Sequence, residues 1–215
     1  MIHFDTITLS VHQHVLLEGT SLHIGENEKV VMCGPSGSGK SSLLKAAVGI
    51  LPLAKGTVMI GGLTLSVETV AKIRAHVAFI GQEPVLGAER VEDALLLPFA
   101  YKAHRHNRPS EETILRTLER LRLTDDILSK PSNRISGGEK QRIAIARALL
   151  LNKQVFLADE TTSALDPESK AAVIEALFQP GITLLSVSHD PDWIAACERI
   201  VEIADCKLME VGGGQ

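Results

Sequence analysis

The sequence predicts an α/β fold with a mainly parallel core sheet, an antiparallel β subdomain and a helical subdomain. Short apolar runs at residues 77–80, 155–158 and 184–187 have the composition of strands buried on both faces. Helical patterns lie between these runs, and strands that alternate with helices form parallel sheets with right-handed crossovers. A hairpin pattern near the N-terminus adds the antiparallel part, and residues 90–150 are mostly helical in pattern.

Length and composition are those of one globular domain. The chain has 215 residues, of which 45% are hydrophobic and 22% charged. We expect a single domain at residues 1–211, whose helical subdomain covers about 90–150, and a flexible glycine-rich tail at 212–215. The formal net charge of −4 argues against a general nucleic-acid-binding surface, so no nucleic-acid partner is predicted.

The cysteines and the apolar runs bear on the compartment. Cys33, Cys197 and Cys206 lack metal-ligand spacing, which predicts free thiols in a reducing compartment. The N-terminus lacks the charged and apolar regions of a signal peptide, and no apolar run is long enough to span a bilayer. If the protein acts at a membrane, we expect another chain to cross it.

The first third of the chain predicts strands and a tight turn. Residues 2–9 alternate in the manner of a half-buried strand, and residues 30–33 form a short buried strand that ends at a glycine. Residues 58–60 and 63–65 flank Gly61-Gly62, which predicts a hairpin because paired glycines tolerate the positive φ of a tight turn.

Three helix starts are marked by capping residues. Ser110 precedes two glutamates, while Asp166 and Asp190 each precede a proline, which favours the first position of a helix. The helix after Ser110 has four apolar residues on one predicted face: Ile114, Leu115, Leu118 and Leu121.

A phosphate-binding loop follows the strand at 30–33. Its residues match G-x-x-x-x-G-K-[ST] and are Gly34, Pro35, Ser36, Gly37, Ser38, Gly39, Lys40 and Ser41, with Ser42 next in the following helix. The glycines let backbone N–H groups curl around phosphate oxygens, and the helix directs its positive end at the same anion. We expect Lys40 to reach the β- and γ-phosphates and the Ser41 hydroxyl to bind Mg²⁺. The alternative, a turn with an exposed lysine, is disfavoured by the strand–loop–helix context; the motif by itself predicts only a nucleoside triphosphate.

The apolar strand at 155–158 ends in two carboxylates, Asp159 and Glu160. A parallel strand beside the phosphate loop delivers Asp159 to the Mg²⁺ shell, where the metal offsets the cost of burying the charge. Glu160 is then placed to accept a proton from an attacking water or to orient it. Strands that end in acids are common, so it is the phosphate loop upstream that makes this pair a candidate site.

A glycine pair opens the helix that we expect to run to about Leu150. Ser136 and Glu139 form an S-x-x-E capping box at its start. Gly137 and Gly138 are poor helix formers, at a cost of about 1 kcal/mol each relative to alanine in a helix interior. A structural cap alone does not require both glycines, whereas an anion that approaches the backbone closely does favour them.

With these motifs in this order, the chain resembles the ATP-binding subunits of ABC transporters over nearly its whole length. The family's signature reads L-S-G-G-[EQ], and Ile135 here replaces the leucine. Gln82, after the strand at 77–80, matches the family's Q-loop glutamine. Residues 163–166, Ser-Ala-Leu-Asp, match its D-loop, and His189 matches its switch histidine. The resemblance implies a P-loop NTPase fold of the ABC ATPase type.

The resemblance also implies the mechanism and the partners. Two ATPase subunits, copies of this chain or homologues, pack head to tail, so that ATP and Mg²⁺ at one Lys40 loop are covered by the other subunit's signature, which is Ser136, Gly137 and Gly138. Glu160 acts as general base, Gln82 and His189 sense the γ-phosphate and the water, and Ser41, Gln82 and Asp159 surround Mg²⁺. A membrane-spanning subunit is the further partner, which implies a cytoplasmic location on the inner face of the cell membrane.

One family feature is weak in this chain. Such subunits have an aromatic residue before the second strand that stacks on adenine, but residues 10–14 contain no ring other than imidazole. His12 is our first choice for this role and His14 the second.

The sequence leaves several alternatives for the process that ATP hydrolysis drives. The apolar residues of 83–87 and 91–101 are either core packing or a groove, with Leu86 and Phe99, for a short helix of a membrane subunit. Segments at 82–86, 97–99 and 127–130 look most like the ATPase subunit of a bacterial iron-export system. A soluble ATPase of iron–sulfur cluster assembly is the main rival; chromosome-organising ATPases are disfavoured by the absence of sustained heptads. A regulator without turnover is disfavoured by the intact Asp159-Glu160 pair.

Overall fold

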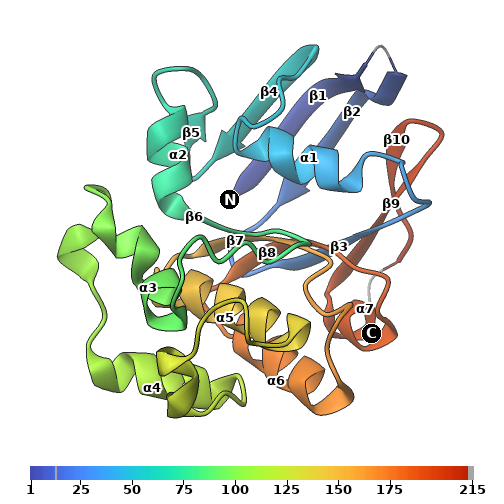
Figure 1. The fold of residues 1–215 in the computed structure, drawn as a ribbon. Helices are drawn as coiled ribbons and strands as arrows, with labels where there is room; N and C mark the ends of the chain where they lie inside the picture. The colour runs from blue at the N-terminus through green and yellow to red at the C-terminus, as the bar shows by residue number, and fades with distance from the viewer. Residues whose placement is uncertain (13, 213–215) are drawn as a thin grey trace.

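The computed structural model describes residues 1–12 and 14–212, whose strands form two sheets (Figure 1). The smaller sheet has the order β2-β1-β4-β5 and is antiparallel. Its strands are β1 (Ile2–Val11), β2 (His14–Ile24), β4 (Lys55–Ile60) and β5 (Leu63–Thr64). The predicted strand and hairpin are therefore confirmed, while residues 213–215 of the predicted tail lie outside the described residues.

The larger sheet has the order β10-β9-β3-β8-β7-β6. Five of its strands run parallel, and the sixth, β10, pairs antiparallel with β9. The bounds are β3 (Lys29–Cys33), β6 (Val77–Ile80), β7 (Val155–Asp159), β8 (Thr183–Val187), β9 (Arg199–Ala204) and β10 (Lys207–Glu210). The carboxyl ends of β3, β6, β7 and β8 consequently meet at one edge, where parallel sheets of this kind bind ligands.

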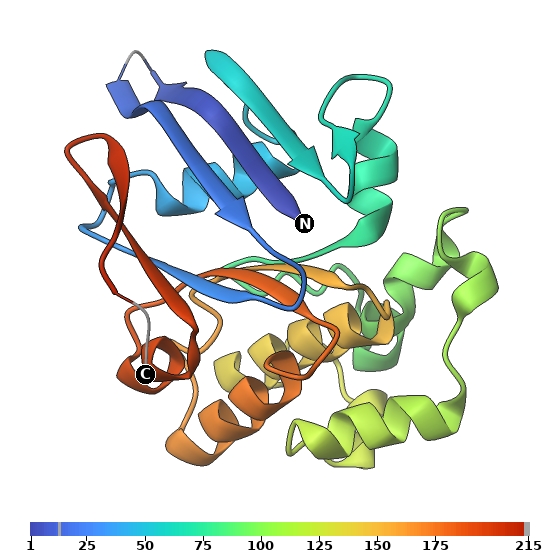
Figure 2. The ribbon, with the colours of Figure 1, turned by 180° about the vertical axis from the view of Figure 1, so that it is seen from behind.

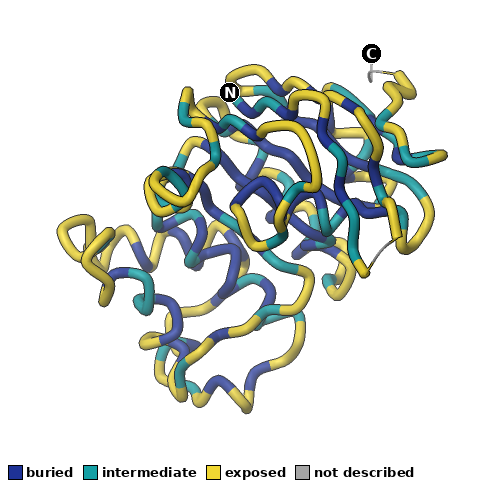
Figure 3. Tube along the Cα trace, turned by 90° about the horizontal axis from the view of Figure 1, so that it is seen from above, coloured by how far each residue is buried: buried dark blue, intermediate teal, exposed yellow. Residues whose placement is uncertain are grey.

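Both faces of the parallel sheet are covered, which explains why most residues of β3, β6, β7 and β8 are apolar. Val30 and Met32 face the core shared with α1 (Lys40–Ala47) and the antiparallel sheet. Val31 faces the opposite core, with α5 (Gly137–Leu150), α6 (Pro167–Leu177) and α7 (Pro191–Ala196). Figures 1 and 2 show these layers from two sides, and Figure 3 shows buried positions along the strands with exposed ones in the connections.

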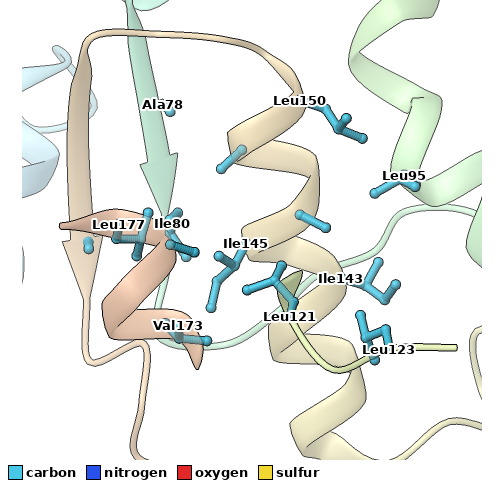
Figure 4. Close-up of a cluster of buried hydrophobic side chains, with 14 of the residues drawn as sticks. Ala78, Ile80, Leu95, Leu121, Leu123, Ile143, Ile145, Leu150, Val173 and Leu177 are labelled. Atoms are coloured by element: carbon cyan, nitrogen blue, oxygen red, sulfur yellow. The ribbon is translucent and has the colours of Figure 1, made fainter. Parts of the chain in front are cut away.

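Residues 90–150, predicted as the helical subdomain, include α3 (Val91–Leu96), α4 (Glu111–Arg120) and α5, and their buried side chains share the second core with the sheet. Helices α3 and α4 pack against α5 and are joined by 3₁₀ turns at Leu97–Ala100 and Arg105–Asn107, and a third 3₁₀ turn at Asp125–Ser129 follows α4. Figure 4 shows Ile143, Ile145 and Leu150 of α5 among side chains from the sheet, α3 and α6. The remaining helix, α2 (Val70–His76), lies beside the antiparallel sheet.

The apolar face of α4 is narrower than predicted. Ser110 caps the helix as expected, and Ile114, Leu118 and Leu121 are buried. Leu115, however, is 37% exposed, so its assignment to the inner face is wrong. One residue turns a helix by about 100°, which carries Leu115 to the rim while Thr117 occupies the buried stripe.

No helix of residues 1–12 and 14–212 is both long and apolar enough to cross a membrane.

Candidate functional site

The phosphate loop lies between the end of β3 and the start of α1, as predicted. Three of its glycines have positive φ: Gly34 at 129°, Gly37 at 80° and Gly39 at 107°. A Cβ on Gly34 would lie 2.7 Å from the carbonyl oxygen of Ile203, and one on Gly39 would lie 2.9 Å from the Cβ of Leu16. Strands β9 and β2 therefore pack directly against the loop, and only glycine fits these two positions.

Polar atoms inside the loop fit a phosphate. Lys40 is only 6% exposed, and its ammonium donates hydrogen bonds of 2.8 Å to the carbonyl oxygens of Gly34 and Pro35. The Ser38 hydroxyl is buried without a hydrogen-bond partner among the described residues. A buried ammonium on carbonyl dipoles and an unpaired hydroxyl, next to the N-terminus of α1, are the groups that a triphosphate would satisfy.

Ser41 and Asp159, 118 positions apart in sequence, are in contact. The Ser41 hydroxyl donates to Asp159 Oδ1 at 2.8 Å, and Asp159 is 3% exposed at the end of β7. Burial raises the pKa of Asp159 above its ordinary value, since the nearby lysines and the Ser41 hydroxyl compensate its charge incompletely. A buried carboxylate beside a hydroxyl is a set of hard oxygen donors that fits Mg²⁺.

A second cluster lies next to this pair. The Gln82 amide donates to Glu160 Oε2 at 3.1 Å, and His189 Nε2 lies 3.9 Å from Glu160 Oε1. Each residue follows a different strand, β6, β7 and β8, so the parallel sheet brings them to one edge. Glu160 has a φ of 46°, and its backbone N–H donates to the Val187 carbonyl, which turns its side chain out of the strand direction.

Asp190 supports this edge from behind. Its carboxylate caps α7 through the N–H groups of Asp192 and Trp193, and it forms an ion pair of 2.6 Å with Lys170 of α6. Burial by itself raises the pKa of Asp190, but the Lys170 ammonium and the helix N–H donors outweigh it and hold the pKa below its ordinary value. His189 thus precedes a rigidly held helix start. The sequence marked Asp190 only as a cap.

The signature segment begins α5 as predicted. Ser136 Oγ accepts from the Glu139 N–H at 3.2 Å, and Glu139 Oε2 accepts from the Ser136 N–H at 2.7 Å, which completes the capping box. A Cβ on Gly137 would meet nothing within 4 Å, whereas one on Gly138 would lie 3.3 Å from the Ala164 carbonyl of the predicted D-loop. The front of the signature is therefore open, and its back packs on the D-loop.

The sheet separates the signature from the phosphate loop of the same chain. Helix α1 packs on one face of the sheet and α5 on the other (Figures 1 and 2). One copy accordingly does not bring its own Ser136 to its own Lys40.

The segment predicted to hold adenine lies beside the phosphate loop. His12 is exposed, with a φ of 47°, and His14 is the exposed first residue of β2. Leu16, two residues further, packs on Gly39. Gln13 lies outside the described residues, and the stacking role of His12 stays a prediction.

Comparison with known proteins decides the family. A family profile described as "ABC transporter" matches residues 17–163, which is most of the chain. The chain belongs to the ABC transporter family.

Curated relatives of this ABC ATPase include subunits of importers and of energy-coupling factor systems. The energy-coupling factor transporter ATP-binding protein EcfA1 of Lacticaseibacillus paracasei is 36% identical over 206 residues, covering 91% of this chain and 72% of that protein. The glutamate/aspartate import ATP-binding protein GltL of Escherichia coli is 33% identical over 202 residues, covering 91% and 83% of the two chains.

A solved structure extends the likeness to the whole fold. A dimeric post-hydrolysis state of the ATP-binding cassette MJ0796 bound to ADP and Pi is 28% identical, covers 100% of this chain and 99% of that one, and has a TM-score of 0.85. The predicted ABC ATPase fold and the prediction of an ATPase subunit are confirmed. The relatives named here are not iron exporters, so they lend no support to the predicted resemblance to an iron-export system.

Two residues that shape the site of this ABC ATPase were not predicted. Leu16 and Ile203 close the phosphate loop from behind, yet each is an ordinary apolar residue in a strand. No motif marks them, because their role comes only from strands β2 and β9 lying next to the loop.

Proposed function

We propose that this chain binds MgATP on the loop of residues 34–41, hydrolyses it in a head-to-tail pair and thereby powers a separate membrane-spanning subunit. The observation that carries the proposal is the arrangement at one sheet edge: the Ser41–Asp159 pair with the Gln82–Glu160–His189 cluster beside it. A subunit that powers a membrane-spanning partner with ATP would bind that partner on the cytoplasmic face of the cell membrane, and we propose this location for the chain.

Each residue has a distinct task in this proposal. Lys40 exchanges the carbonyls of Gly34 and Pro35 for phosphate oxygens, and Ser41 and Asp159 hold Mg²⁺. When bound, the metal supplies charge compensation for the phosphate oxygens. Glu160 accepts the proton of the attacking water, and its side chain is oriented by Gln82 and His189, which follow β6 and β8.

Gln82 and His189 hold the water and the γ-phosphate in reach of Glu160. Both already approach the Glu160 carboxylate, at 3.1 and 3.9 Å. We also assigned Gln82 to the Mg²⁺ shell; its amide here points to Glu160, so contact with the metal would require it to turn away from that carboxylate.

The pairing follows from the open front of the signature. Gly137 and Gly138 place backbone N–H groups at the N-terminus of a 14-residue helix, which favours an anion, and the Ser136 hydroxyl lies beside them at the N-cap. Since the chain's own loop lies across the sheet, the anion comes from another subunit, either a second copy or a homologue. The similar MJ0796 cassette is a dimer in its ADP- and Pi-bound state, which supports such a pairing.

The test of the nucleotide site is Lys40→Ala, measured as phosphate release and ATP binding. We expect hydrolysis to be lost, because the phosphates lose the buried ammonium that compensates their charge. Lys72→Ala, which changes an exposed lysine of α2, is the control and should retain activity. Near-normal turnover of Lys40→Ala would refute the assignment.

The test of the base and of the pairing is Glu160→Gln. This variant should bind ATP but not hydrolyse it, and should therefore accumulate as a dimer in size-exclusion chromatography with ATP and Mg²⁺. A variant that stays monomeric under these conditions and hydrolyses ATP at the normal rate contradicts the role of Glu160.

The adenine platform is tested by His12→Ala, which should raise the KM for ATP. Because His12 directly follows β1 and His14 begins β2, His14→Ala is the matched comparison. An unchanged KM in His12→Ala moves the role to His14 or to another residue.

The membrane partner and its cargo form the finer part of the proposal. Leu86 and Phe99, which we considered for a docking groove, are each only 6% exposed and belong to the core. Val85 and Tyr101 are large apolar residues of this region that are exposed, and we assign the contact with the membrane subunit to them. Co-purification with a multi-span membrane protein supports transport, whereas retention of soluble assembly factors favours iron–sulfur cluster assembly.

Iron export stays a prediction. It is tested by measuring whether iron stimulates ATP hydrolysis by the complex reconstituted with its membrane subunit.

A further inference from the structure

Arg147, near the end of α5, holds the segment that follows Gln82. Its guanidinium donates to the carbonyl oxygens of Val85 at 2.9 Å, Leu86 at 3.0 Å and Ala94 at 3.4 Å. Burial lowers the pKa of Arg147. Among residues 1–12 and 14–212, no carboxylate forms an ion pair with it, and the hydrogen-bond acceptors found for its guanidinium are backbone carbonyls.

These contacts suit an arginine and no other side chain. A planar guanidinium presents several N–H donors in fixed directions, whereas a lysine ammonium is a compact charge on a flexible stem. Arg147 also spans two elements, because Val85 and Leu86 precede α3 while Ala94 lies within it. The side chain therefore joins α5, α3 and the segment after Gln82 into one body.

The same body reaches both halves of the proposed ATP site. Gln82, three residues before Val85, bonds to Glu160 at 3.1 Å. The other end of α5 is the signature, Ser136–Gly138. The segment has a second attachment to the residues before α5: the Ser132 N–H donates to the Glu89 carbonyl at 2.7 Å. These contacts tie α5 and the residues before it to the segment that follows Gln82.

We propose that Arg147 is a positioning residue for hydrolysis. It holds the segment after Gln82 so that the Gln82 amide lies within hydrogen-bond distance of Glu160, and it couples this distance to the position of the signature helix α5. The proposal rests on the proposed function, because it takes the Glu160 cluster as the hydrolytic site. The plain alternative is that Arg147 only satisfies buried carbonyls and stabilises the fold.

A double-mutant cycle separates the two roles. Arg147→Lys keeps the positive charge but loses the planar set of N–H donors of the guanidinium. The kcat, the KM for ATP and the thermal unfolding temperature are measured for this variant alone and in combination with Gln82→Ala. We expect Arg147→Lys to lower kcat between about twofold and thirtyfold, the range for residues that modulate coupling, with an unchanged KM. Added to Gln82→Ala, Arg147→Lys should lower kcat by less than about twofold relative to Gln82→Ala alone, because Arg147 acts through the Gln82 side chain that this background already lacks.

Arg142 provides the matched control on the same helix. Its guanidinium bonds to the Leu121 and Arg122 carbonyls and to Ser169 Oγ, and none of these contacts involves the Gln82 segment. Any loss caused by Arg142→Lys should therefore be equal with and without Gln82→Ala.

Equal losses for Arg147→Lys in both backgrounds would overturn the proposal, as would an unchanged kcat with lowered thermal stability. If Arg147→Lys does not fold, Arg147→Gln, which keeps two amide donors, replaces it in the same cycle. Failure of the proposed function is distinguished by Lys40→Ala: turnover retained in that variant refutes the nucleotide site, whatever the Arg147 cycle shows.

Discussion

The buried hydrogen bond between Trp193 and Ser186 provides a test of how the region behind His189 is held. The Trp193 indole N–H donates to Ser186 Oγ at 2.9 Å, and Ser186 Oγ donates to the Val30 carbonyl at 3.1 Å. Ser186 is 0% and Trp193 1% exposed. The bond connects α7 to β8, the two elements on either side of His189.

Ser186→Ala should destabilise the protein by about 1–3 kcal/mol, because it leaves a buried indole N–H without an acceptor. For a protein of this size, each kcal/mol lowers Tm by roughly 2–4 °C. Trp193 is the single tryptophan, so its fluorescence follows urea unfolding directly. The midpoint should fall while the slope m stays constant, since the surface exposed on unfolding is unchanged.

Ser129→Ala, at an exposed serine, is the control and should change stability by no more than about 0.5 kcal/mol. A loss below about 0.5 kcal/mol for Ser186→Ala would refute the reasoning. It would mean that the indole N–H finds another acceptor, or that water reaches it.

Three further predictions concern thiols, acid and the phosphate loop. Burial raises the pKa of Cys197 to about 12, so iodoacetamide at pH 8 should label partly exposed Cys206 in the native protein and Cys197 only after denaturation, as read by peptide mass spectrometry. Because the pKa of Asp190 is lower in the folded than in the unfolded protein, Asp190 stabilises the fold at pH values above the ordinary carboxyl pKa, and this stabilisation is lost as the pH falls through the pKa of the folded state. The difference in urea midpoint between the native chain and Asp190→Asn should therefore disappear below about pH 4. Its ion pair with Lys170 is the reason, and a gap independent of pH would contradict it. Gly39→Ala should cost about 1–3 kcal/mol for its positive φ and abolish ATP binding, because the added Cβ lies 2.9 Å from a β2 side chain; unaltered ATP affinity and Tm would exclude this packing.

Local signals in the sequence identified most elements of the fold. The strands β3, β6, β7 and β8 are predictable because burial on both faces makes most of their residues apolar. The caps Ser110, Ser136, Asp166 and Asp190 are predictable because a cap acts within three residues of itself.

The hairpin β9–β10 escaped prediction for a physical reason. Its turn residues, Asp205 and Cys206, have φ of 48° and 58°, a conformation that normally calls for glycine or asparagine. The misplaced Leu115 has a related origin: the pattern of α4 shows where the apolar side is, but not how wide a stripe its neighbours cover.

By itself the sequence determined the phosphate loop, the acidic strand end and the capped glycine pair, because each motif acts through neighbouring residues. Only the tertiary structure decided that Ser41 touches Asp159, that Gln82 bonds to Glu160, and that the signature lies across the sheet from the loop. It alone also revealed Arg147, whose acceptors are backbone carbonyls. Every residue has such a carbonyl, so no pattern of side chains marks which ones a distant arginine will meet.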